Sequence, residues 1–206
     1  MTNAAPLLDP RFRRLLGRRA WDALPPAVQR RFSKRLSRTS VALYRGRIVE
    51  TRFSTAGWAL AQLLRLVGAP LPICRDENVP ALVCVSEDGP SGGQVWSRLY
   101  GRRTGFPKVI HSAKRFAGPT GLEEYVGRGI GMALRVEPMA DGLRFVSDHY
   151  FLMLGRVRLK LPRWMEPGRT LVEHHDRGGG EFVFDLELRH PLFGRMVRQR
   201  ALFRDA

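Results

Sequence analysis

The chain has 206 residues, 44% of them hydrophobic, and a formal net charge of +16 at pH 7. This length and composition predict one domain with one substantial core. The sequence has no run of eighteen apolar residues and no apolar stretch near its start, so we expect neither a transmembrane helix nor a signal peptide and predict a cytoplasmic protein. The two cysteines, Cys74 and Cys84, match no zinc or redox spacing, so we expect neither a metal nor a cofactor.

The positive charge is concentrated near the N-terminus, where residues 1–52 contain 13 basic and 3 acidic side chains. Asp9 followed by Pro10 is typical of a helix start, and Val28, Phe32 and Leu36 recur at a spacing of four with basic residues between them. The pattern predicts a basic amphipathic helical segment over 1–38 that lays its apolar stripe on the domain and solvates its charges. The alternative is a surface for an anionic membrane, an acidic partner or, nonspecifically, a nucleic acid.

A second apolar segment, residues 57–67, carries only one charge, that of Arg65. A helix that is hydrophobic on all sides is normally buried, and about eleven residues are too few to span a bilayer. We expect this helix, with Trp58 near its start, to plug the mouth or concave face of a curved sheet. The other interpretation is that it enters a membrane interface.

Most of the remaining chain reads as short strands separated by glycine and proline turns. The predicted strands are 41–53, 79–88, 94–103, 107–116, 121–128, 130–139, 142–154, 157–162, 170–176, 181–190 and 194–203. The fold class is therefore mainly β, with N-terminal helices and one buried apolar helix. We expect a curved antiparallel sheet or β-barrel of about ten strands, forming a single domain over 39–206.

Several stretches resemble an uncharacterised bacterial domain family: YRGRIVETR, the apolar helix, GGQVWSRLYGRR, LPRW, and the stretch over 182–197. Its members occur alone or behind saccharopine-dehydrogenase-like and other Rossmann-type oxidoreductases. The resemblance covers about 25–204. It implies a module that works beside a reductase, and it assigns no catalytic residue.

The histidines are the candidate catalytic groups. His149, in the middle of a strand, and His111 are candidate general bases, and Glu123 is a candidate carboxylate partner. The densest polar run, 173–176, alternates faces, so that His174 and Asp176 share one side and His175 the other. Adjacent histidines make a poor metal site, and we expect this run to be a solvated strand end.

Trp96, Arg98 and Tyr100 alternate along one strand and share a face. Stacking on single-stranded nucleic acid is one interpretation, but no nucleic-acid-binding signature accompanies it. We predict instead a barrel-like module that encloses a lipid or another apolar or amphipathic small molecule, in the service of a partner oxidoreductase. The expected ligand-binding residues are Trp58, Trp96, Arg98, Tyr100, Tyr150 and Trp164. An enzyme that uses a histidine or glutamate base in the same cavity is the alternative.

Overall fold

A computed structural model describes residues 8–37, 40–66, 71 and 75–205. Its helices and strands are α1 (Arg11–Leu16), α2 (Arg18–Asp22), α3 (Pro26–Phe32), β1 (Ala42–Phe53), α4 (Thr55–Leu66), β2 (Val79–Asp88), β3 (Gly93–Tyr100), β4 (Lys108–Arg115), β5 (Glu123–Gly127), β6 (Ile130–Met139), β7 (Gly142–Leu154), β8 (Val157–Lys160), the 3-10 helix η1 (Arg163–Met165), β9 (Arg169–Gly178), β10 (Glu181–His190) and β11 (Gly194–Asp205).

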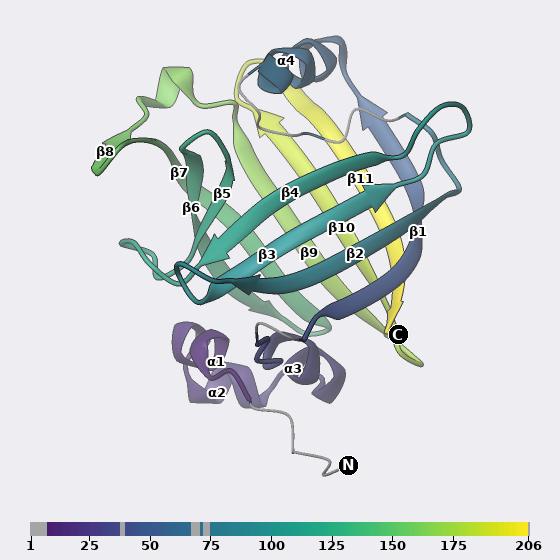
Figure 1. The fold of residues 1–206 in the computed structure, drawn as a ribbon, viewed down its shortest axis with the longest axis vertical. Coiled ribbons are helices and arrows are strands. Elements are labelled where there is room, and N and C mark those ends of the chain that lie inside the picture. Colours follow the sequence, from purple (N-terminus) through teal and green to yellow (C-terminus); the bar gives the residue numbers. More distant parts are fainter. Residues whose placement is uncertain (1–7, 38–39, 67–70, 72–74, 206) are drawn as a thin grey trace.

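The strands form one antiparallel β-barrel (Figure 1). Neighbours along the sheet run from β6 back to β1, then through β11, β10 and β9 to β7, and the pairing of β6 with β7 closes the ring. Of the strands in the described residues, ten make the barrel, while β8 pairs only with the end of β7 and lies outside the ring. The predicted fold class, a mainly β protein with an antiparallel barrel of about ten strands, is confirmed.

Period-2 alternation explains how these sequences form a closed wall. Along β2, for example, Val79, Ala81, Val83 and Val85 are buried while the residues between them are not. Register shifts after Ile48 and after Ala133 add local bends, which help a sheet to curve. At Gly46 a Cβ atom would lie 2.0 Å from the Leu202 carbonyl oxygen, so the close approach of β1 to β11 requires glycine there.

Helix α4 covers one end of the barrel (Figure 1). Ser54 Oγ accepts a hydrogen bond from the Gly57 N–H at 3.1 Å and so caps its first turn. Gly57 packs directly against the backbone of Met196 in β11. The burial expected on all sides holds for one face only, because Trp58 is 45% exposed and Leu63 also faces solvent. Among the described residues, no helix is long and apolar enough to cross a membrane.

Helices α1, α2 and α3 lie across the opposite end (Figure 1). Phe12, Trp21, Val28 and Phe32 are buried in one cluster with barrel residues such as Phe145. The apolar side chains of α1, α2 and α3 are thereby used in packing on the barrel. α3 ends at Phe32, so the helix is shorter than the apolar spacing suggested.

One arginine departs from the expectation that the basic side chains of this segment are solvated. The side chain of Arg31 is only 4% exposed. Its Nη1 lies 2.6 Å from Asp176 Oδ1, its Nη2 lies 2.8 Å from Asp205 Oδ2, and its guanidinium stacks 4.4 Å from the centre of the Phe182 ring. Arg31 therefore ties α3 to the ends of β9 and β11, which is a tertiary role that a helical charge pattern cannot show.

Candidate functional site

A cavity of about 750 Å³ occupies the barrel interior and extends to the α4 end. Its wall is mostly apolar. Inward-facing side chains that line it include Val83, Ile110, Val126, Met132, Phe145, Leu152, Val172, Leu186 and Ala201, and α4 contributes Leu60, Leu63 and Leu64. Alternation along every strand places one set of side chains inside, so an apolar period-2 pattern produces an apolar lumen.

A charged cluster interrupts this apolar wall. Lys114 of β4 donates from Nζ to Glu124 Oε2 at 2.9 Å, and Ser112 Oγ donates to Glu124 Oε1 at 2.7 Å. Arg98 of β3 lies 3.3 Å from the same carboxylate and donates to Ser112 Oγ at 3.1 Å. The Lys114 ammonium also sits 4.9 Å from the centre of the Trp96 ring. Three adjacent strands thus bring two cations and one carboxylate into a largely apolar lumen.

The electrostatics of this cluster follow from burial and pairing. Burial by itself would raise the pKa of Glu124, but Lys114 and Arg98 outweigh it and hold that pKa at about 2. Burial lowers the pKa of Lys114, and Glu124 opposes the shift. Glu124 is consequently a carboxylate at neutral pH, and the cluster presents positive charge from Arg98 to the lumen.

The lumen also contains tyrosine hydroxyls. Tyr150 O–H lies 2.6 Å from Thr170 Oγ1, and burial raises the pKa of Tyr150 to about 12. Burial likewise raises the pKa of Tyr100. Both phenols are therefore neutral near pH 7 and offer hydrogen bonds to an occupant of the lumen.

Four of the six expected ligand-binding residues line the cavity: Trp96, Arg98, Tyr100 and Tyr150. The other two do not. Trp58 lies on the outer side of α4, and Trp164 in η1 is 82% exposed. The helix of Trp58 does cover the cavity, but a different face of that helix is turned inward.

Two of the three candidate catalytic residues meet outside the lumen. His149 and Glu123 are buried on the outer side of β7 and β5, where Arg158 of β8 bridges them. Arg158 Nη2 lies 3.1 Å from His149 Nε2, and His149 Nδ1 lies 2.8 Å from Asp148 Oδ2. The contacts of Arg158 with Glu123 and His149 hold β8 on the barrel wall.

The third candidate, His111, borders the cavity through its place in β4. Its side chain is exposed, and its Nδ1 lies 2.9 Å from Ser97 Oγ. Alternation with the buried Ile110 and Ser112 turns the ring to the outside of the barrel. Glu124, Glu166 and His190 are lining residues of the cavity that do carry a carboxylate or an imidazole.

Lys114 and Glu124 were not among the site residues predicted from the sequence. Each occurs on a predicted strand, and alternation places Ser112 and Lys114 on one face. Their meeting depends on the register of β4 against β5, in which Lys114 is opposite Glu124. The sequence did contain one indication of a carboxylate in the lumen. Adjacent residues of a strand face opposite sides of the sheet, so one of the two carboxylates at 123–124 had to point inward.

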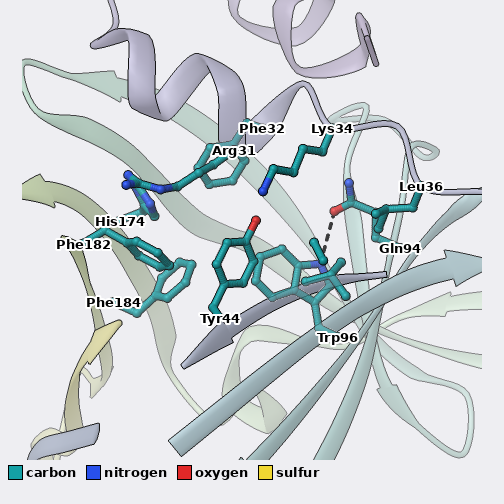
Figure 2. Close-up of a pocket in the computed structure, with 12 residues that line it drawn as sticks. Arg31, Phe32, Lys34, Leu36, Tyr44, Gln94, Trp96, His174, Phe182 and Phe184 are labelled. Carbon is teal, nitrogen blue, oxygen red and sulfur yellow. Dashed lines mark hydrogen bonds between the residues drawn. The ribbon is translucent and has the colours of Figure 1, made fainter. Parts of the chain in front are cut away.

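The run 173–176 is not a solvated strand end, which corrects that expectation. His174 is 1% exposed because α3 covers this end of β9 (Figure 2). Its ring stacks on Phe182 at 4.9 Å and meets Phe32 edge-on, and neither ring nitrogen has a hydrogen-bond partner within the part of the chain that the structure describes. The predicted alternation is confirmed, since His175 contacts Asp141 on the other face while Asp176 joins Arg31.

A small cavity of about 20 Å³ adjoins His174, and Figure 2 shows its lining. Lys34, from the segment after α3, extends toward the hydroxyl of Tyr44, and Trp96 Nε1 donates to Gln94 Oε1 at 3.2 Å. Phe32, Trp96 and Phe184 border both cavities, so they separate this space from the main lumen. Among the described residues, no group of three or more His, Cys, Asp or Glu side chains is placed to hold a metal ion.

Acid is expected to destabilise the protein through His174. Burial, and then the nearby Arg31 charge, lower its pKa to about 3 from an ordinary value of 6.5. As the pH falls below about 6.5, the unfolded chain binds a proton at His174 that the folded protein binds only near pH 3, so stability is lost across that window. Urea denaturation should show about 2 kcal/mol of this loss between pH 7 and pH 5.

The variant His174→Phe isolates this effect. It should remove that part of the pH dependence and, by replacing an unpartnered polar ring with an apolar one, raise stability at pH 7 by about 1–3 kcal/mol. His175→Phe, on the outer face, is the matched control and should leave the buried contribution in place. An unchanged pH slope in His174→Phe would contradict the assignment.

The structure defines a closed antiparallel β-barrel with an apolar lumen and a charged cluster in its wall. Comparison with known families then places the chain: residues 24–203 match the family described as Domain of unknown function (DUF4166), and the chain belongs to it. The match spans nearly the same residues as the resemblance noted above. Searches of curated proteins and of solved structures found no match.

Proposed function

We propose that this protein binds an apolar or amphipathic small molecule inside the barrel. The observation that carries the proposal is the cavity of about 750 Å³, whose lining is mostly aliphatic and aromatic. Ligand sites in proteins typically measure about 300–1,000 Å³ and combine an apolar lining with a few polar groups. An acyl chain or a comparable hydrocarbon skeleton is the chemistry that suits such a lumen.

The charged cluster supports an acidic head group for that ligand. Arg98 and Lys114 together outweigh the single carboxylate of Glu124, and the Arg98 guanidinium faces the lumen. A planar guanidinium pairs bidentately with a carboxylate or phosphate. The ligand we propose is therefore an amphipathic acid whose head lies near Arg98 and whose tail fills the apolar space.

Filling the lumen tests this function. Leu186 lies in the middle of the wall, with the cavity-lining residues Val172 and Gln199 opposite it on the two neighbouring strands. Leu186→Trp should reduce by at least tenfold the amount of lipid-like ligand that copurifies with the protein, as measured by native mass spectrometry and extraction. Leu202→Trp, on the outer face of β11, is the control and should retain ligand. Wild-type protein that takes up neither extracted lipids nor added fatty acid would contradict the proposal.

Two further expectations bear on this proposal. A Rossmann-type oxidoreductase remains the predicted partner, and this prediction rests only on the family resemblance described in the sequence analysis. The alternative of an enzyme loses its two candidate histidine bases, because the rings of His149 and His111 turn away from the lumen.

A further inference from the structure

Exposed apolar side chains gather at the α4 end of the barrel. Trp58 and Leu63 of α4, Trp164 and Met165 of η1, and Leu192 and Phe193 of the β10–β11 turn are all exposed. Strand directions place all three segments at this end, since β1 enters α4 here, β9 begins here and β10 ends here (Figure 1). We call these six side chains the mouth patch.

The mouth patch is continuous with the entrance to the lumen. Leu63, Met165 and Phe193 line the cavity and are also exposed to solvent. Leu192 at the tip of its turn is 84% exposed, and Phe106, in the β3–β4 loop at the same end, is 91% exposed. Large side chains of this kind on loop tips make an apolar surface that a soluble monomer rarely exposes without a partner.

Basic side chains stand beside the exposed apolar ones. Arg163 precedes Trp164, Arg195 follows Phe193 by two residues, and Phe106 lies between Arg103 and Lys108. All four basic residues are exposed. Tryptophan, phenylalanine and leucine next to arginine and lysine are typical of surfaces that enter the boundary between lipid head groups and acyl chains.

We propose that the mouth patch docks the barrel on an anionic lipid bilayer, with the entrance of the lumen facing the membrane. The apolar tips enter the interface, and the surrounding basic side chains meet anionic head groups. The inference adds a partner surface to the proposed function and does not depend on it, because the evidence is exposed surface and charge and not the cavity. It also differs from membrane contact through the N-terminus, whose apolar stripe is packed against the barrel.

Vesicle co-sedimentation tests the docking. The 206-residue chain should bind vesicles that contain phosphatidylcholine and phosphatidylserine in equal amounts, bind pure phosphatidylcholine vesicles much less, and be released by high salt. The double variant Trp164→Ser with Leu192→Ser should bind at least tenfold more weakly, because two large apolar side chains are lost from the interface. Arg163→Glu should weaken binding roughly fivefold or more.

The matched control removes two exposed apolar side chains from the opposite end of the barrel. Leu8→Ser with Val41→Ser should bind vesicles like the wild type, since Leu8 and Val41 lie near α1 and α3. The cavity-filling variant Leu186→Trp should also bind vesicles normally while it loses its ligand, which separates the two proposals. Equal weakening in both serine double variants, no vesicle binding, or self-association that buries Trp164 would overturn the docking.

Discussion

Lys114→Met is expected to destabilise the protein by about 3 kcal/mol. The substitution keeps the length of the side chain but leaves Glu124, which is buried within the barrel wall, without its closest cation at 2.9 Å. Arg98 at 3.3 Å and the Ser112 hydroxyl remain, and they moderate the loss. Urea denaturation of the ligand-free protein at pH 7 measures the change.

The second substitution Glu124→Gln should restore most of that stability in the Lys114→Met background. The double variant carries no unpaired buried carboxylate, and neutral replacements of a buried pair often cost little. Lys108→Met, at the exposed start of β4, is the matched single control and should change stability by less than about 0.5 kcal/mol. If the double variant were as unstable as Lys114→Met alone, the loss would reflect packing and not the charge.

Arg31→Met should cost a comparable amount, about 3 kcal/mol. The change leaves Asp176 and Asp205 without the guanidinium that pairs with both, and it removes the stacking on Phe182. Asp205 is partly exposed and can be solvated, which keeps the loss below that of a fully buried triad. Because α3 closes this end of the barrel, we also expect faster proteolysis within the first 40 residues.

Arg30→Met is the matched control for Arg31. It is the adjacent residue of α3 but is exposed, so its loss should leave both stability and protease resistance close to the wild type. Equal effects of Arg30→Met and Arg31→Met would show that helix propensity, and not the buried ion pairs, governs the result.

The positions of the strands could be predicted because they depend on local pattern. Alternating apolar residues between glycine and proline turns, as over 142–154 and 181–190, specify which residues form strands and which of their side chains share a face. The same rule explains why Trp96, Arg98 and Tyr100 all line the lumen, since alternate residues of one strand lie on the same side of a closed sheet. Barrel closure follows less directly, because it requires β1 to pair with β11, and these two strands lie at opposite ends of the chain.

The neighbours of a side chain were harder to predict than the face of the sheet on which it lies. His149 and Glu123 were expected near one another and are linked by Arg158, yet they lie on the outer wall under the β7–β8 hairpin. A mid-strand histidine has the same sequence signature whether it faces the lumen or a covering hairpin. His174 likewise resembles an exposed strand end until α3 is placed over it.

The sequence by itself determined that this protein is mainly β, with about ten antiparallel strands in a curved sheet or barrel, that one apolar helix accompanies the strands, and that Trp96, Arg98 and Tyr100 share a face. These follow from period-2 alternation and turn residues, which are local. Only the tertiary structure decided that Lys114 meets Glu124 in the lumen, that Arg31 is buried, and that the exposed apolar side chains gather at the α4 end. Each of these depends on strand register and on how the helices lie across the barrel, which bring together residues far apart in the chain.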